Sequence, residues 1–262
     1  MNGDRPRAST DYTSLLVDPA GPAPKWETEG QAEVHGLLMR CAVAFAQECN
    51  RRPSPKFPRD STRSAALRFG RGLGADESAA FLRALEAGLA TVAPDGGFLI
   101  PTARACSPNL HLVGRNEDHV AVHTEVLIHV GAYAELVLDC GWEPERLAFD
   151  PFTRGAALDL WGFKGPAGVN WWDGTIVFVA EAKARVAGSD SLTGLASALE
   201  RLQADSTVSA DSGHRRKWDE LVTIVGQHGS VELLLVADGA RWWYDVTPST
   251  DGGAPIRIDR RR

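Results

Sequence analysis

The sequence predicts an α/β protein in which a central mixed sheet is flanked by helices and preceded by a mainly helical part. Two segments, 176–179 and 231–237, are apolar at almost every position, which is typical of strands buried in the middle of a sheet. Helical patterns at 191–205 and 214–227 lie between these segments and can cover the sheet. Apolar residues near the start of the chain recur at three- and four-residue steps from about Gly30, which indicates an amphipathic helix.

The composition restricts the classes of protein to which this chain can belong. The chain has 262 residues, and its 44% hydrophobic content is enough for a real core and excludes disorder throughout. No apolar run approaches the roughly 20 residues of a membrane span. The first residues lack the apolar stretch of a secretory signal, and the four cysteines contain no CxxC pair, so we expect a cytoplasmic protein.

The net charge of −6 argues at first sight against a nucleic-acid partner, but the charge is unevenly spread. Residues 50–71 carry seven basic side chains and a single acid, Asp60. A local basic segment of this kind can meet phosphates even when the whole chain is acidic.

Residues 1–110 are expected to form an arm and a helical module. Three prolines in 51–58 interrupt the first helix, and Asp76 is a suitable N-cap for a later one. The expected elements are a flexible arm at 1–25, helices from about 30, at 61–69 and after Asp76, and a hairpin of 91–93 with 98–100. Three helices followed by a hairpin resemble a winged-helix module, which we place at 26–110.

Residues 111–262 are expected to form the α/β domain. Its elements are a helix at 116–140, strands at 147–149, 157–163 and 174–185, helices at 191–205 and 214–227, a strand at 231–237 and an edge strand at 241–246.

The chemistry-bearing residues lie on two successive strands. Glu181 and Lys183 are two residues apart at the end of a buried strand, so they point to the same face. Asp159 lies between two leucines in the preceding strand. If the loop 165–173 closes a hairpin, Asp159 lies beside Glu181. Two adjacent buried carboxylates repel each other, and a hard divalent cation is the usual resolution. The alternative is an internal ion pair with one additional acid.

This arrangement resembles the core of the PD-(D/E)XK nuclease superfamily, the restriction-endonuclease-like fold, over roughly residues 116–246. The resemblance implies a metal-dependent hydrolysis of phosphodiester bonds. It implies that Asp159, Glu181, the backbone carbonyl of Ala182 and Glu125 hold Mg²⁺ or Mn²⁺, and that Lys183 positions the attacking water. Leu158 stands where many members have proline, and Asp150 followed by Pro151 has the two residues in reverse order, so we set that pair aside as a decoy.

Several further residues are candidates for nucleic-acid contact. Trp171 and Trp172 lie on the predicted hairpin loop, and Gln203 lies on a helix where some relatives carry a glutamine. The basic candidates from the first half are Arg51, Arg52, Lys56, Arg59, Arg63 and Arg68. For each of these the ordinary role also stands open: a solvated loop, a core tryptophan or an exposed helical glutamine. We expect the second tryptophan pair, Trp242 and Trp243, to anchor the core, and the arginine-rich segment 257–262 either to contact phosphates or to be disordered.

The sequence therefore predicts a DNA nuclease acting in defence, restriction or repair. It leaves open RNA as the substrate, endonuclease against exonuclease action, and assembly as a homodimer or as a subunit of a larger defence complex. The alternative from another class is a catalytically idle nuclease fold that serves as a nucleic-acid-binding or assembly subunit. A phosphohydrolase acting on a single nucleotide is a third hypothesis.

Overall fold

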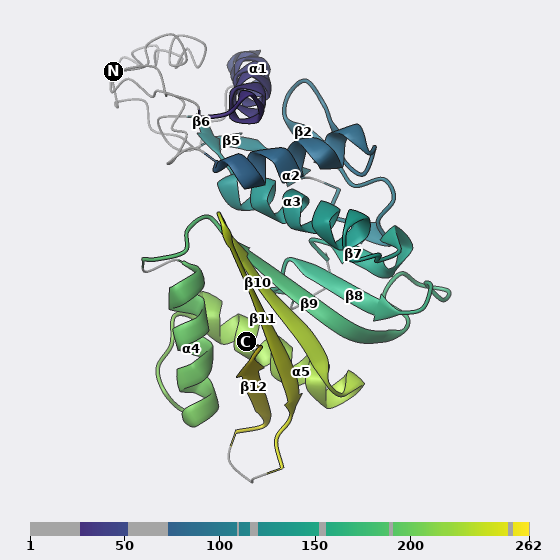
Figure 1. Cartoon of the computed structure of the whole chain (residues 1–262), viewed down its shortest axis with the longest axis vertical. Coiled ribbons are helices and arrows are strands. Elements are labelled where there is room, and N and C mark those ends of the chain that lie inside the picture. The colour runs from purple at the N-terminus through teal and green to yellow at the C-terminus, as the bar shows by residue number, and fades with distance from the viewer. Residues whose placement is uncertain are drawn as a thin grey trace, which may run out of the picture.

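The computed structural model describes residues 27–51, 73–108, 110–115, 120–151, 156–188, 191–250 and 254–261. It confirms a mixed α/β fold in which helices flank a large mixed sheet (Figure 1). Within the described part, no helix has the length and apolar character needed to cross a membrane.

The main sheet has seven strands in the order β12-β11-β10-β9-β8-β7-β3. β9 pairs in parallel with β10, and β3 pairs in parallel with β7, while the other neighbours are antiparallel. The bounds are β3 (Ala105–Cys106), β7 (Leu147–Phe149), β8 (Leu160–Lys164), β9 (Thr175–Lys183), β10 (Val231–Ala237), β11 (Ala240–Pro248) and β12 (Ile256–Arg260).

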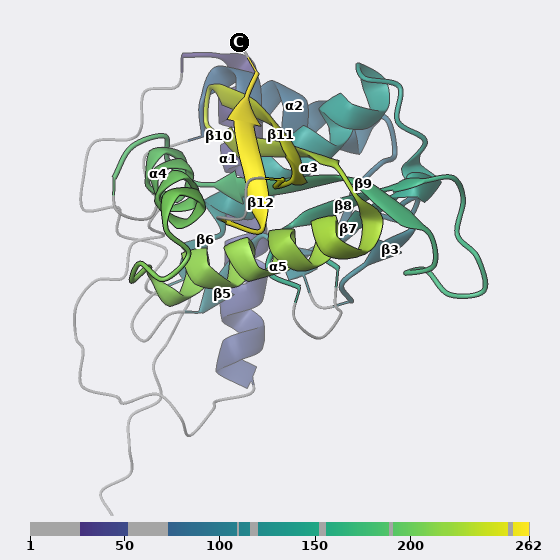
Figure 2. The same cartoon turned by 90° about the horizontal axis from the view of Figure 1, so that it is seen from below.

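Helices cover both faces of this sheet. α3 (Thr124–Leu138) packs on one face, and α4 (Leu192–Ala204) and α5 (Ser212–His228) cover the other (Figure 2). The strands β9 and β10 are buried on both faces, because each contributes alternate residues to two separate apolar cores. This is why their sequences are apolar rather than alternating. Ser191 and Asp211 cap α4 and α5 by accepting hydrogen bonds from backbone N–H groups of the first turns.

The N-terminal part packs against α3. α2 (Ala75–Glu86) lies along α3, and α1 (Glu29–Arg51) lies against α2. Its strands form two small sheets, and their bounds are β1 (Thr91–Val92), β2 (Gly97–Leu99), β4 (Leu110–His111), β5 (Val113–Arg115) and β6 (Val120–Val122). A short 3₁₀ turn, η2 (Pro144–Arg146), precedes β7. The apolar residues of α1 and α2 belong to the same core as the α3 face of the main sheet.

Arg241 of β11 ties this N-terminal part to the sheet. Its guanidinium donates hydrogen bonds of 2.7 and 3.0 Å to both carboxylate oxygens of Glu77 on α2, which is fully buried. It also donates bonds of 2.8 and 2.7 Å to Glu135 on α3. One side chain therefore links three elements that are far apart in sequence.

The predicted helix at 116–140 is wrong in its first part. Residues 120–122 form β6, which pairs with β5, and the helix begins at Thr124. The predicted N-cap Asp76 is also wrong, because Gly74 holds that position and Asp76 lies in the first turn. The hairpin of 91–93 with 98–100 is confirmed by the pairing of β1 with β2.

The prediction of an edge strand at 241–246 is wrong as well, because β12 pairs along β11 and forms the edge. Residues 257–260 of the segment 257–262, which was expected to contact phosphates or to be disordered, belong to that strand. Ile256 points into the core, while Arg257, Asp259 and Arg260 remain exposed. The predicted arm at 1–25 and helix at 61–69 lie outside the described residues, so the winged-helix hypothesis stays a prediction.

Candidate functional site

The register of β8 on β9 brings Asp159 and Glu181 together. Leu160 lies opposite Ala180, and the N–H of Asp159 donates to the carbonyl of Ala180 at 3.0 Å. The carboxylate of Asp159 then accepts a hydrogen bond of 2.7 Å from the N–H of Ala182. Asp159 precedes β8 rather than lying within it, and it is fixed at the C-terminal end of β9. The two acids are therefore neighbours, as the hairpin argument requires.

Glu181 is almost completely buried and is contacted by two lysines. Its side chain is 2% exposed, and its Oε1 lies 3.2 Å from Nζ of Lys183. Nζ of Lys217, on α5, lies 3.1 Å from the same oxygen. Glu181 and Lys183 share the face of the sheet that α5 covers, as residues two apart on a strand must. The sequence argument identified Lys183 and missed Lys217.

The two carboxyl groups have perturbed acidities. Burial raises the pKa of Asp159, and its hydrogen bond from Ala182 and the charges of the two lysines oppose this effect. Burial also raises the pKa of Glu181 well above its usual value, and the charge of Asp159 adds to the rise. The other carboxylate oxygen of Glu181, Oε2, is buried and receives no hydrogen bond from a donor in the described residues, and the carboxyl of Asp159 lies within hydrogen-bonding reach of Glu181. The pair thus favours a proton or a cation between its members.

Glu125, in the first turn of α3, reaches the same end of β9. Its Oε1 accepts a hydrogen bond of 3.3 Å from the N–H of Ala184 and lies 3.6 Å from Nζ of Lys183. Its side chain is 42% exposed, so it lies at the solvent side of the cluster. The structure therefore brings together all four side chains that the sequence proposed as catalytic: Asp159, Glu181, Lys183 and Glu125.

The donor set fits a hard cation through two carboxylates. In the described part of the chain no three His, Cys, Asp or Glu side chains stand close enough to hold a metal among them. Mg²⁺ does not need such a cage, because it usually keeps several waters and takes one or two protein carboxylates together with substrate phosphate oxygens. Asp159 and the unpartnered Oε2 of Glu181 supply such a pair.

Asp150, set aside on sequence grounds, lies beside Asp159. Its N–H donates a 2.7 Å hydrogen bond to the carbonyl of Asp159, since β7 and β8 are antiparallel and Phe149 pairs with Leu160. Its backbone has a φ of 45°, a left-handed conformation that is uncommon outside glycine. Burial raises the pKa of its carboxyl, and the charge of Asp159 contributes to the rise.

Glu220 on α5 is a second residue that the sequence argument missed. One of its carboxylate oxygens accepts hydrogen bonds of 2.6 and 2.8 Å from the N–H groups of Ala157 and Leu158, and the other accepts one of 3.0 Å from the indole of Trp161. It therefore holds the backbone directly before Asp159. Burial raises its pKa to about 7.

A usable signal for Lys217 was present in the sequence. Residues 214–217 read His-Arg-Arg-Lys, a basic run in the first turns of α5. The buried Trp218 and Leu221 fix which side of α5 faces the sheet. Lys217 lies beside this buried stripe, so a helical projection of the run would have pointed it toward β9.

Of the other residues predicted to contact nucleic acid, only Arg51, Gln203, Trp171 and Trp172 lie in the described part of the chain. Arg51 is the last residue of α1, and Arg52, Lys56, Arg59, Arg63 and Arg68 lie outside the described residues. Gln203 uses its side-chain oxygen to accept a 2.7 Å hydrogen bond from the N–H of Ile258 on β12. Trp171 is half-buried and packs against the α5-side core, while Trp172 is 54% exposed.

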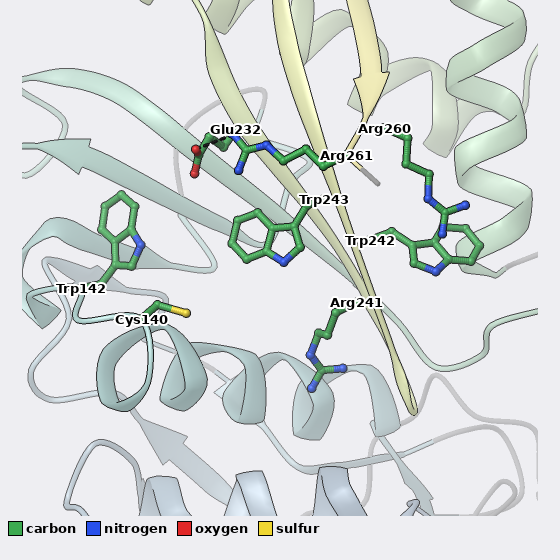
Figure 3. A pocket seen from close by; sticks show the side chains of 8 residues that line it. All are labelled: Cys140, Trp142, Glu232, Arg241, Trp242, Trp243, Arg260 and Arg261. Carbon is green, nitrogen blue, oxygen red and sulfur yellow. Dashed lines mark hydrogen bonds and ion pairs between the residues drawn. The ribbon is translucent and has the colours of Figure 1, made fainter.

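A separate hollow of about 650 Å³ adjoins β11 and β12 (Figure 3). Arg261 lies over it and is bound to Glu232 at 2.6 Å and to Asp245. Trp243 packs on the buried Phe178, and Arg260 stacks on Trp242 with its guanidinium carbon 4.3 Å from the ring centre. Both tryptophans are partly buried and pack against the cores, as expected, and most of the hollow's positive charge is already paired.

The acid and lysine cluster at the end of β9 is thus the best-formed candidate site in the described structure. Its two carboxylates, an unpartnered oxygen and two ammonium groups suit the binding of a cation and of an anionic substrate. Comparison with known proteins finds no matching family model, no matching curated protein and no matching solved structure.

Proposed function

We propose that this protein is a metal-dependent nuclease that hydrolyses phosphodiester bonds in DNA. The observation that supports it best is the placement of Asp159 and Glu181 side by side, with Oε2 of Glu181 unpartnered and Lys183 at 3.2 Å from Oε1. The resemblance to the PD-(D/E)XK superfamily supplies the reaction class, and a role in defence, restriction or repair follows from that resemblance alone.

Each side chain has a definite task under this proposal. Asp159 and Glu181 hold Mg²⁺ or Mn²⁺, with Glu125 and the carbonyl of Ala182 as further oxygen donors. Such an ion would supply a water of lowered pKa and would offset charge on the phosphate. Lys183 orients that water and stabilises the negative charge that develops on the phosphate oxygens. Lys217 provides a second ammonium group at the same place.

A cleavage assay across nucleic-acid types tests the proposal. Single- and double-stranded DNA and RNA are incubated with the protein in Mg²⁺, in Mn²⁺ or in EDTA. We expect cleavage of DNA with metal, none in EDTA, and none by Asp159→Ala or Lys183→Ala at unchanged melting temperature. Lys164→Ala, which removes an exposed lysine at the end of β8, is the matched control and should retain full activity. Wild-type protein that leaves every substrate intact with both metals contradicts the proposal.

A second candidate function is a nuclease fold that has lost catalysis and serves as a binding or assembly subunit. The observation in its favour is that two lysines within 3.2 Å of Glu181 already balance its charge without any metal. Calorimetric titration with Mn²⁺ separates the two. Heat of binding that disappears in Asp159→Ala supports the nuclease, and the absence of binding to wild-type protein supports the subunit.

A further inference from the structure

A groove of about 610 Å³ runs along α5 on the same side of the sheet as the acid and lysine cluster. Its lining combines aromatic and aliphatic side chains with a few charged ones, and the residues that matter here are Trp161, Trp172, Arg216, Glu220, Ile224 and His228. This size lies in the range of ligand-binding pockets.

One end of the groove adjoins the candidate active site. Glu220 lines the groove and also binds the backbone of Ala157 and Leu158, directly before Asp159. Arg216 lines it too, and the next residue is Lys217, which contacts Glu181. From Arg216 to His228 the helix α5 rises about 18 Å. The groove is therefore long enough to hold more than one nucleotide on the side of Asp159 and Glu181 toward which it extends.

The near end of the groove carries one arginine, Arg216, that can meet a phosphate, and the carboxyl groups of Asp219 and Glu220 line the groove beside it. Arg216 is exposed and forms no ion pair with any other residue in the described ranges. Its neighbour Arg215 differs, because it donates hydrogen bonds to the carbonyls of Ser206 and Val208 and so holds the loop before α5. Arg216 is therefore not needed for that local structure.

The far end of the groove presents an exposed aromatic ring. Trp172, on the loop between β8 and β9, is 54% exposed, which is unusual for so large an apolar side chain. The ring of Trp172 meets the ring of Trp171 edge to face, with 5.7 Å between the ring centres. The ring centre of Trp171 lies 6.3 Å from that of Trp161, so a row of three indoles connects Trp172 to the core. The indole of Trp172 is thereby partly exposed at the surface while it contacts Trp171.

We propose that this groove binds an unpaired strand of nucleic acid, with a phosphate at Arg216 and a base stacked on Trp172. Aromatic stacking of this kind requires a base that is free of its partner, so the preferred substrate has a single-stranded stretch next to the cleaved bond. The inference rests on the proposed nuclease function and names its substrate class. The exposed guanidinium of Arg216 offers a contact for one phosphate, and the exposed ring of Trp172 favours a single strand over a duplex, which cannot present an unstacked base.

Binding measured without cleavage tests this inference separately from catalysis. Fluorescence anisotropy of a labelled single-stranded oligonucleotide and of a blunt duplex of the same sequence is followed in EDTA. Trp172→Ala should weaken binding of the single strand about 10-fold and leave binding of the duplex unchanged. Trp172→Phe, which keeps a stacking ring, should recover most of the loss. Val169→Ala, a 99% exposed position of the same loop, should change nothing.

Arg216→Ala should weaken binding and lower the slope of log affinity against log salt by about 0.7, the value for one phosphate contact on a single strand. Arg201→Ala removes an exposed arginine of α4 as its control. Single-strand binding that is unaffected by Trp172→Ala, an equal loss for the duplex, or a wild-type protein that binds no single strand would each overturn the inference. Metal-dependent cleavage of duplex DNA would leave the proposed function standing in all three cases.

Discussion

The link through Arg241 gives a prediction whose magnitude follows from the structure. Replacing Arg241 by methionine removes four hydrogen bonds to carboxylates and two to backbone carbonyls, and it leaves the carboxylate of Glu77 fully buried without its counter-charge. Breaking a buried ion pair by removing one partner costs about 3–5 kcal/mol. We expect a loss of that size in the free energy of unfolding at pH 7.5, measured by urea denaturation.

The pH dependence of Arg241→Met identifies the cause of the loss. Burial already raises the pKa of Glu77, although Arg241 opposes the rise, so removing the guanidinium raises it further. A carboxyl whose folded pKa exceeds its unfolded value stabilises the fold fully below the unfolded pKa of 4.5, and this contribution is lost as pH rises through the folded pKa. The deficit should therefore be smaller at pH 4.5 than at pH 7.5.

A double variant and a surface control complete this experiment. Arg241→Met combined with Glu77→Leu should recover much of the lost stability, because no unpaired charge then remains buried. Arg83→Met breaks an exposed ion pair with Asp139 and should leave the urea midpoint unchanged. If Arg241→Met lies within about 1 kcal/mol of wild type, or if the double variant is as unstable as the single one, the reasoning from buried charge is refuted.

Three further predictions concern pH and packing. Burial raises the pKa of Glu220 to about 7. The stabilisation from this raised pKa is therefore complete below pH 4.5 and is lost as the pH rises through 7. Glu220→Gln should flatten that decline in the free energy of unfolding, measured in denaturation series from about pH 4.5 to 8. Burial lowers the pKa of His129 to about 3, so the unfolded chain takes up the proton first and stability falls as pH drops below 6.5; His129→Phe should weaken this acid sensitivity in the same series. Gly162→Ala places a methyl group 2.9 Å from Cβ of Phe178 and from the ring of Trp142, and it should cost about 1–3 kcal/mol in urea unfolding.

The central part of the site could be predicted because it depends on short-range geometry. Alternation along a strand places Glu181 and Lys183 on one face, and a hairpin places Asp159 opposite them. These rules require only that the strands be recognised, and their continuous apolar runs allowed this. The same reasoning set Asp150 aside on residue order, although the pairing of β7 with β8 brings it next to Asp159.

The features that could not be predicted from the sequence depend on very short strands or on contacts between segments that are far apart in the chain. Val120–Val122 is a three-residue strand whose apolar pattern also suits the start of a helix, and only its partner β5 decides between them. Ile256–Arg260 alternates apolar and charged residues, but its arginine content suggested a tail until β11 was seen to pair with it. Lys217 lies 34 residues after Lys183 in sequence, and its contact with Glu181 depends on how α5 is rotated on the sheet.

The charge balance of the cluster explains how one site can serve both stability and chemistry. Asp159, Glu181 and the partly exposed Glu125 bring three carboxyl groups to the ammonium groups of Lys183 and Lys217, and burial raises the pKa of Glu181 well above its usual value. Because both lysines contact Oε1 of Glu181, Oε2 stays unpartnered and available. A cation bound there would add positive charge beside two ammonium groups, and an anionic ligand would offset part of that charge, which links metal binding to the arrival of a phosphate. Under the nuclease proposal the two should therefore bind cooperatively, because each supplies the charge that the other needs.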